Sequence, residues 1–275
     1  MTDTIAANRA AEPTHASPPP RRPYGLLRHS LVLARRSLVK IRRGPEGLAD
    51  AVVLPVVFLS MFVYLFGGAV AGSPRQYLQY VFPAALVMTV IIAGMMVTGI
   101  NLNADISKGV FERFRSLPIG RSAPLIGSVL GDMIRYLVSL AALFAFGYLL
   151  GFRAQTDPLS VLAACALAVV FAFCLSWAYV LVGVVIREPG GVQGIAITTL
   201  FPLAFGTSLV APTATMPGWL QAWVKVNPVT HAMDACRGLL LGGQVAGPVV
   251  KTLLWSAAFL AVFAPLAVRA YRRRT

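Results

Sequence analysis

Six long apolar runs constrain this chain more than any other feature of its sequence. They cover roughly residues 51–71, 77–101, 122–152, 158–186, 191–211 and 246–270. A helix that crosses the hydrocarbon core of a bilayer needs about 20 mostly apolar residues, and each run reaches that length. The runs are apolar nearly all round, unlike the single apolar stripe of a surface helix. The chain is therefore expected to be an all-α membrane protein with six transmembrane helices.

The composition supports a membrane protein and argues against other classes. Mean hydropathy is +0.73 and 12% of the residues are charged, against about 25% in soluble domains. The net charge of +14 would suit a nucleic-acid partner, but aromatic and basic side chains alternate only in the short stretch FERFR. We therefore expect no nucleic-acid partner. The three cysteines and three histidines lack metal-type spacing, so no metal site and no disulfide framework are expected.

Basic residues are distributed unequally between the segments that join the runs. They are concentrated before the first run, between the second and third, and after the last, whereas the first outer loop holds Arg75 alone. Because Lys and Arg are enriched on the cytoplasmic side of membrane proteins, both termini are expected in the cytoplasm. Asp132 and Arg135 lie inside the third run, three positions apart, so they are predicted to form an intramembrane charge pair.

The N-terminal part contains two different segments. Residues 1–22 are polar and rich in proline, which predicts a disordered cytoplasmic tail. Residues 23–45 combine an apolar stripe at helical spacing with several arginines, so they are expected to form an amphipathic interfacial helix that Gly44-Pro45 ends. This helix either anchors the chain on anionic lipid or also contacts a cytoplasmic partner. The remaining residues, 46–275, are expected to form the six-span domain.

The segment 212–243 is neither a full span nor a simple polar loop. Trp219 and Trp223 suit a short helix at the membrane interface, and Asn227-Pro228 is a good start for a second one. We expect two short helices that dip into the outer leaflet. Asp234 and Arg237 are three positions apart and are expected to pair on one helix face.

The charged segment between the second and third runs has a helical pattern over 104–117. Apolar Val110, Phe111, Phe114 and Leu117 recur at helical intervals, Lys108, Glu112 and Arg115 occupy the opposite face, and Pro118 ends the pattern. Such a helix presents apolar side chains with a charged rim, as helices that dock into a partner do. The alternative is a helix that rests on lipid headgroups.

Common catalytic motifs are absent from the sequence. There is no G-x-x-x-x-G-K-[ST] phosphate loop, no H-E-x-x-H and no G-x-S-x-G, so the chain is not expected to be an enzyme or to hold a cofactor. Flexible methionines and flat aromatic rings in spans two and five suit the binding of varied apolar molecules, although they are also ordinary packing residues. These candidate path residues are Met88, Met95, Met96, Phe201 and Phe205.

Several long motifs resemble one known family, in the same order along the chain. The run NADISKGVFERFRSLPIGRSAPLIGSVLGDMIRY is similar to the central signature of ABC-2 type transporter permeases. YLFGGAVAGSPRQYLQYVFPA, LGFR, FCLSWAYVLVG and PGWLQAWVKVNPVTHAMDACRGLL resemble the actinobacterial daunorubicin-resistance permeases. The likeness runs from about residue 45 to 245, whereas the first 22 residues match no family pattern.

The resemblance implies an ABC-2 permease of the type V exporter-like fold. It implies two permease copies, as a homodimer, with two separate ATPase subunits that bind ATP and magnesium and power the export of hydrophobic drugs or antibiotics. It implies a coupling helix that meets the ATPase, and a path between the permeases lined mainly by spans two and five. The coupling residues would be Lys108, Phe111, Glu112, Arg113, Phe114, Arg115 and Leu117.

Three alternatives differ from drug export. The first is an ABC exporter whose cargo is an envelope lipid or a lipid-linked glycan; nothing in the spans separates these cargoes from drugs. A second class is a membrane scaffold or sensor that recruits a cytoplasmic protein without transporting anything. A third class, an enzyme acting on membrane lipids, would require clustered polar or metal-binding side chains that the spans lack.

Overall fold

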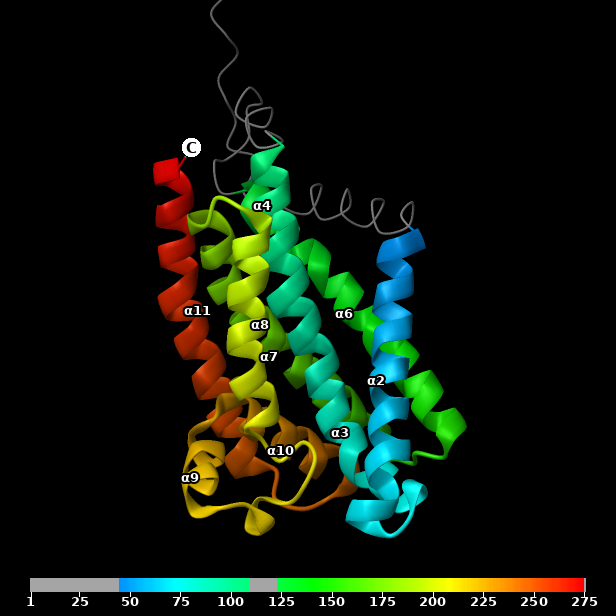
Figure 1. Ribbon diagram of the computed structural model, residues 1–275. Coiled ribbons are helices and arrows are strands. Elements are labelled where there is room, and N and C mark those ends of the chain that lie inside the picture. Colours follow the sequence, from blue (N-terminus) through cyan, green and yellow to red (C-terminus); the bar gives the residue numbers. More distant parts are fainter. Residues whose placement is uncertain (1–44, 109–122, 275) are drawn as a thin grey trace, which may run out of the picture.

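The computed structural model describes residues 45–108 and 123–274, and all regular structure in these ranges is helical (Figure 1). The all-α expectation is therefore confirmed for the described part of the chain. The tail expected over 1–22 and almost all of the interfacial helix expected over 23–45 lie outside it. The elements are α2 (Pro45–Ala71), α3 (Pro74–Ile92), η1 (Ala93–Thr98), α4 (Gly99–Ser107), α6 (Ala123–Leu150), α7 (Pro158–Val185), α8 (Pro189–Phe205), η2 (Thr213–Thr215), α9 (Gly218–Val226), α10 (Pro228–Leu241) and α11 (Ala246–Arg274).

Helices occupy all six apolar runs, but they differ in length. Five described helices are long and apolar enough to cross a membrane: Ala51–Ala71, Pro74–Ser107, Val129–Leu150, Pro158–Val185 and Ala246–Arg273. The sixth, α8, has 17 residues, which at 1.5 Å per residue is about 26 Å, against a hydrocarbon core of about 30 Å. The expectation that this span reaches residue 211 is wrong, because the helix ends at Phe205 and Gly206 follows.

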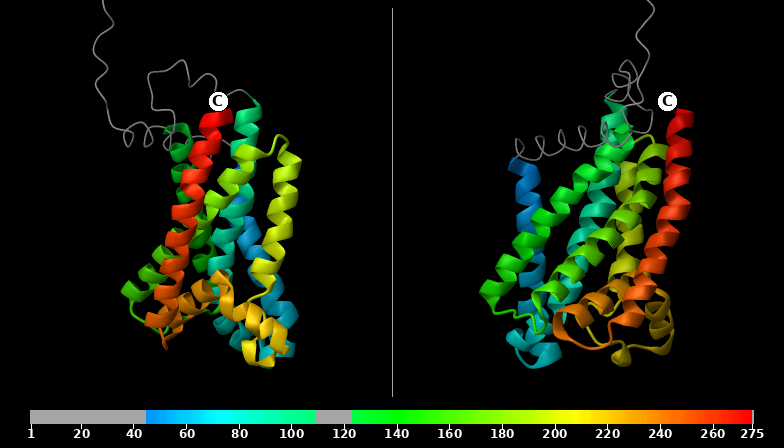
Figure 2. Two further views of the ribbon diagram at one scale, coloured as in Figure 1. Left: turned by 90° about the vertical axis from the view of Figure 1, so that its left-hand side faces the viewer. Right: turned by 180° about the vertical axis from the view of Figure 1, so that it is seen from behind.

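The described part of the chain enters and leaves the helix bundle at the same end. The start of α2, the end of α4, the start of α6 and the C-terminal end of α11 lie at the upper end in Figure 1. The α2–α3 turn, α9 and α10 lie at the opposite end in every view (Figure 2). This arrangement agrees with an even number of helices that run from one end to the other.

The second apolar run forms a longer helix than its sequence predicts. The elements α3, η1 and α4 follow one another without a break from Pro74 to Ser107. Residues 104–107 therefore complete this helix, and the expectation of a separate helix that begins at 104 is wrong. The helix continues because no proline or glycine stands between Gly99 and Lys108. At its end, the main-chain N–H of Lys108 bonds to the oxygen of Ala104. The rest of the expected segment, 109–117, lies outside the described residues.

Helix α3 is the central helix of the bundle. Its side chains are buried at nearly every position from Tyr77 to Ile91, because it contacts α2, α6, α7 and α10. Leu78, Phe82 and Leu86 belong to the larger apolar cluster, which these helices share. A smaller cluster joins α4, α7 and α11 toward the end of the bundle where α4 ends, and it includes Leu102 and Trp177. The polar sites below lie where α3 and its continuation meet these neighbours.

Candidate functional site

The residues expected to contact an ATPase lie mostly outside the described ranges. Lys108 is exposed and follows the last residue of α4. The other expected contact residues have no described position: Phe111, Glu112, Arg113, Phe114, Arg115 and Leu117. The contact therefore remains a prediction, with one described residue at its border.

The residues expected to line a transport path lie in two different environments. Met88 and Met95 are 1% and 0% exposed inside the apolar core. Phe201 and Phe205 are 58% and 48% exposed on α8, and their rings stack with centroids 5.4 Å apart. The side chain of Met96 is not described. In a single chain, the phenylalanines are thus accessible to a partner or to lipid, whereas the two methionines are packing residues.

A small cavity lies between α2, α3 and the end of α6. It measures about 230 Å³ and is lined by Val63, Tyr64, Pro74, Arg75, Leu78 and Leu150. Pockets that hold drug-sized molecules measure about 300–1,000 Å³. This cavity is therefore too small for a drug, and none of the expected path residues lines it.

Asp132 and Arg135 form the ion pair that their spacing predicts. The guanidinium of Arg135 donates to Asp132 Oδ1 at 2.8 Å, and the two side chains are 10% and 14% exposed respectively. The other carboxylate oxygen, Oδ2, accepts a 2.7 Å hydrogen bond from the hydroxyl of Thr98. Both carboxylate oxygens thus have partners, which a charge in apolar surroundings requires.

Thr98 connects this ion pair to an irregular turn of the central helix. It is the last residue of η1, a π-helical turn, and π-helical turns within α-helices are frequent at functional sites. A Cβ on Gly94 in the same turn would lie 3.0 Å from the hydroxyl oxygen of Tyr136, so glycine leaves space for that ring. Sequence reasoning missed Thr98 and Tyr136. A polar side chain in an apolar run was the available signal.

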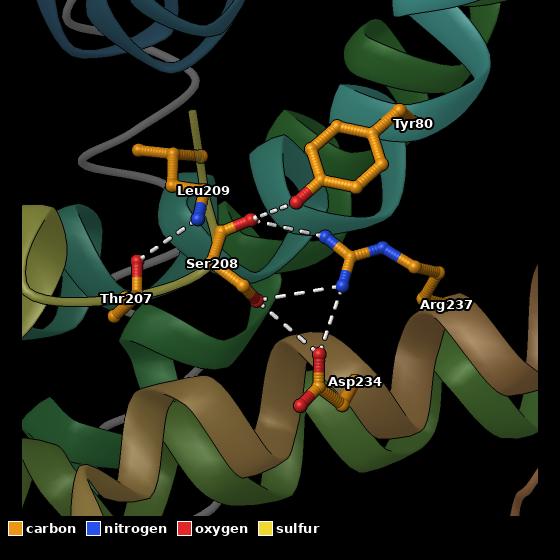
Figure 3. A network of polar contacts seen from close by, with 6 residues as sticks. All are labelled: Tyr80, Thr207, Ser208, Leu209, Asp234 and Arg237. Carbon is orange, nitrogen blue, oxygen red and sulfur yellow. Dashed lines mark hydrogen bonds and ion pairs between the residues drawn. The ribbon is translucent and has the colours of Figure 1, made fainter. Parts of the chain in front are cut away.

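A second polar network lies at the end of the bundle that contains α9 and α10, and Figure 3 shows it. As the spacing predicts, Arg237 Nη1 pairs with Asp234 Oδ1 at 2.8 Å on α10. Arg237 Nη2 also donates to the main-chain oxygen of Ser208 at 3.2 Å. The hydroxyl of Ser208 donates to Asp234 Oδ1 at 3.2 Å. The network thus holds the segment that follows α8 against α10.

Tyr80 connects the same network to α3. Its hydroxyl donates to the main-chain oxygen of Ser208 at 2.8 Å, and the guanidinium carbon of Arg237 lies 4.4 Å from the centre of its ring. One turn earlier, the hydroxyl of Tyr77 donates to the main-chain oxygen of Val210 at 3.0 Å. Sequence reasoning missed both tyrosines, although a tyrosine in an apolar run usually finds a partner for its hydroxyl.

A side chain of α9 and the residue between α9 and α10 bind the main chain where α8 ends. The amide of Asn227 donates to the oxygens of Leu203 and Gly206 at 3.0 and 2.8 Å, and the indole N–H of Trp223 donates to the oxygen of Pro202 at 3.3 Å. The last carbonyls of a helix have no partner within it, so these bonds stabilise the early end of α8. Asn227 is also the N-cap of α10, as expected, with Pro228 in the first turn.

The loop between α6 and α7 contains a charged helix cap. Asp157 accepts hydrogen bonds from the hydroxyl of Ser160 at 2.7 Å and from its main-chain N–H at 3.1 Å. Two hydrogen bonds hold the pKa of the Asp157 carboxyl below its usual value: the bond from the Ser160 hydroxyl has the larger effect, and the main-chain bond the smaller.

Among the described residues, no three His, Cys, Asp or Glu side chains could hold a metal ion together.

Comparison with known proteins identifies the family of this chain. The family described as ABC-2 type transporter matches residues 28–241. A daunorubicin resistance ABC transporter permease of Streptomyces coeruleorubidus is 44% identical over 87% of this chain and 84% of the relative. A probable doxorubicin resistance permease of Mycobacterium tuberculosis is 28% identical over 89% and 88%. A putative transport permease of Cyanophora paradoxa is 25% identical over 78% and 75%.

The match covers the central helix, the Asp132–Arg135 pair and the network around Ser208. The apolar helices and this extended similarity have one explanation in common. The chain belongs to the ABC-2 type transporter family and is a multi-pass protein of the bacterial plasma membrane.

Proposed function

We propose that this chain is the membrane subunit of an ATP-driven exporter that moves hydrophobic or amphipathic compounds, including drugs or antibiotics, out of the cell. The main support for this proposal is the 44% identity to a daunorubicin resistance permease over most of both chains. The six helical runs, with both termini in the cytoplasm, form its transmembrane domain. The segment 212–243 provides short helices at the outer face.

The path lies between two copies of this chain, in a complex with two ATPase subunits. Two features support this arrangement. The cavity beside α3 is too small for a drug, and the stacked rings of Phe201 and Phe205 are exposed in a single chain. Met88 and Met95 would reach the path only after α3 and η1 separate from their present neighbours. Membrane lipid surrounds the complex and is a further contact of the exposed helices.

Energy enters through the segment that follows α4. The ATPase subunit binds ATP and magnesium, since this chain lacks a phosphate loop and no cofactor is assigned to it. The partner contacts Lys108 and the coupling residues Phe111, Glu112, Arg113, Phe114, Arg115 and Leu117. When ATP brings the two ATPases together, their motion displaces the end of α4, and because α4 continues α3, the central helix moves and opens the path outward.

Reconstitution of this chain with the ATPase encoded beside it tests the proposal. The complex is placed in liposomes, and ATP-dependent movement of fluorescent amphipathic drugs and of labelled lipids is measured separately. Drug movement supports the proposal, movement of lipid alone replaces the drug by a lipid cargo, and neither movement with intact ATPase binding supports a scaffold.

The docking role has its own test. Simultaneous replacement of Phe111, Arg113 and Phe114 by alanine is expected to abolish copurification of the ATPase. The matched control is Arg273→Ala, which removes an exposed basic residue near the end of α11. Unchanged ATPase binding in the triple variant would contradict the coupling role of this segment.

A further inference from the structure

The side chain of Asn103 connects two helices at the end of the bundle opposite α9 and α10. Asn103 lies on α4, four positions before the last residue of that helix, and is 0% exposed. Its amide nitrogen donates to the main-chain oxygens of Gly183 on α7 and of Ile186, which directly follows α7, at 2.9 and 2.7 Å. Both acceptors are carbonyls, so only the amide nitrogen can face them.

These bonds complete the C-terminal end of α7. That helix ends at Val185, with Ile186 as its cap residue, and the last carbonyls of a helix have no partner within it. In an apolar environment, a carbonyl without a partner costs as much as a lost hydrogen bond. A side chain 80 positions earlier in the chain therefore caps α7, and the cap belongs to α4.

Two glycines allow this contact, because they let the two main chains touch. A Cβ on Gly183 would lie 2.5 Å from the main-chain oxygen of Gly99. A Cβ on Gly99 would lie 2.9 Å from the oxygen of Tyr179. Neither distance leaves space for a side chain, so α4 and α7 cross at main-chain contact. The amide of Asn103 reaches two carbonyls of α7 because the helices are this close.

Helix α7 extends the connection to α11. Leu102, the neighbour of Asn103, belongs to the apolar cluster that includes Trp177 and Val184 of α7 and Tyr271 of α11. The ends of α4, α7 and α11 thus form one packed group at this end of the bundle. A displacement of α4 that keeps the Asn103 bonds must also displace α7.

We propose that Asn103 is a positioning residue for transport: it makes α7 follow α4 when the ATPase moves the end of α4. This proposal rests on the function proposed above, because it requires that motion reach α4 from an ATPase. It adds α7, and through it α11, to the helices that move in the cycle. Without the two hydrogen bonds, packing contacts still connect α4 to α7, but α7 follows α4 less closely and less substrate crosses per ATP.

The decisive variant is Asn103→Asp, which keeps the size of the side chain and replaces the amide NH₂ donor by a carboxyl oxygen. An ionised carboxylate only accepts hydrogen bonds, so it cannot bond the two carbonyls, whereas a protonated carboxyl supplies one O–H donor. Position 103 is 0% exposed, and burial raises the pKa of a carboxyl, so the loss is expected to shrink as the pH falls. The matched control is Asn101→Asp, the same change at an exposed position two residues away on α4.

The first measurement is the number of fluorescent amphipathic drug molecules moved per ATP hydrolysed in the reconstituted complex. For Asn103→Asp at pH 8 we expect a decrease of about thirtyfold, the factor that corresponds to the loss of two ordinary hydrogen bonds. Partial recovery is expected at pH 5.5, with ATPase binding unchanged at both pH values. Asn101→Asp should behave as the wild type. An unchanged ratio for Asn103→Asp at pH 8 would overturn the proposal.

The second measurement needs no substrate and so separates this proposal from the proposed function. Spin labels are introduced as unnatural amino acids at the exposed positions Ser107 and Arg187, beyond the contact on each chain segment. Pulsed electron paramagnetic resonance then reports the distribution of distances between α4 and the end of α7. We expect a broader distribution for Asn103→Asp at pH 8 than for the wild type or Asn101→Asp. Equal distributions would contradict the connection even if the complex exports drugs.

Discussion

The hydroxyl of Tyr80 donates a 2.8 Å hydrogen bond to the main-chain oxygen of Ser208, a residue 128 positions later in the chain. Arg237 binds the same oxygen at 3.2 Å and lies against the ring of Tyr80. Three separate parts of the bundle, α3, the segment that follows α8, and α10, thus meet at one carbonyl (Figure 3). Any movement that separates α3 from α8 at this end must break the bond between Tyr80 and Ser208.

Removal of the Tyr80 hydroxyl measures the contribution of this bond. Tyr80→Phe is expected to lower the free energy of unfolding by about 1 kcal/mol, the usual value for one hydrogen bond. For a chain of this size that is about 2–4 °C in the melting temperature in detergent. Tyr64→Phe is the control, because Tyr64 is 66% exposed on α2. Equal melting temperatures for the two variants would show that the bond adds no stability.

Substitution of one member of the buried ion pair is expected to lower the stability of the chain more than substitution of both members. Asp132→Leu leaves the cation of Arg135 buried without its counter-charge, which costs about 3 kcal/mol. Replacement of both residues, Asp132→Leu with Arg135→Met, removes both charges and is expected to recover most of that loss. Thermal unfolding of the two single variants and the double variant checks this. A double variant that is less stable than Asp132→Leu would contradict the account.

Main-chain contact between α4 and α7 predicts a large difference between two glycine substitutions. Gly183→Ala places a Cβ 2.5 Å from the oxygen of Gly99, so the helices must separate, at a cost of about 1–3 kcal/mol. Gly194→Ala on α8 meets nothing within 4 Å and is expected to be neutral or to stabilise by up to about 1 kcal/mol. The melting temperatures of both variants decide, and a stable Gly183→Ala would be evidence against the close crossing.

The cap of α7 predicts a dependence of stability on pH. The pKa of Asp157 is lowered in the folded chain, chiefly by the hydroxyl of Ser160. The carboxylate therefore contributes stability above its unfolded pKa of about 3.9, and this contribution is lost as the pH falls through the lower folded value. Asp157→Asn keeps an acceptor for the cap but does not titrate.

The melting temperatures of the wild type and Asp157→Asn should be compared from about pH 6 to about pH 3, on either side of the unfolded pKa. The advantage of the wild type is expected to shrink as the pH falls. Because the side chain is exposed, only the direction of this change is predicted. A difference that stays constant with pH would mean that the Asp157 carboxylate contributes no pH-dependent stability.

Local features of the sequence predicted much of this fold. The apolar runs predicted a helix at each of six places, and Asn227-Pro228 predicted the start of α10. Both ion pairs, Asp132–Arg135 and Asp234–Arg237, were predicted because residues three apart on a helix share one face. These predictions need only neighbours within one helical turn, so the sequence by itself was sufficient.

The contacts between distant segments depended on the tertiary structure. Met88 is buried and Phe201 exposed, yet both lie in helices that are apolar nearly all round. Lipid tails and protein cores are similarly apolar, so side-chain chemistry does not tell which face of such a helix meets a neighbour. The same limit applies to Asn103, whose two acceptors at the end of α7 and just after it are 80 and 83 positions away. The sequence determined that these residues are helical, and the packing of the bundle decided which of them bind one another.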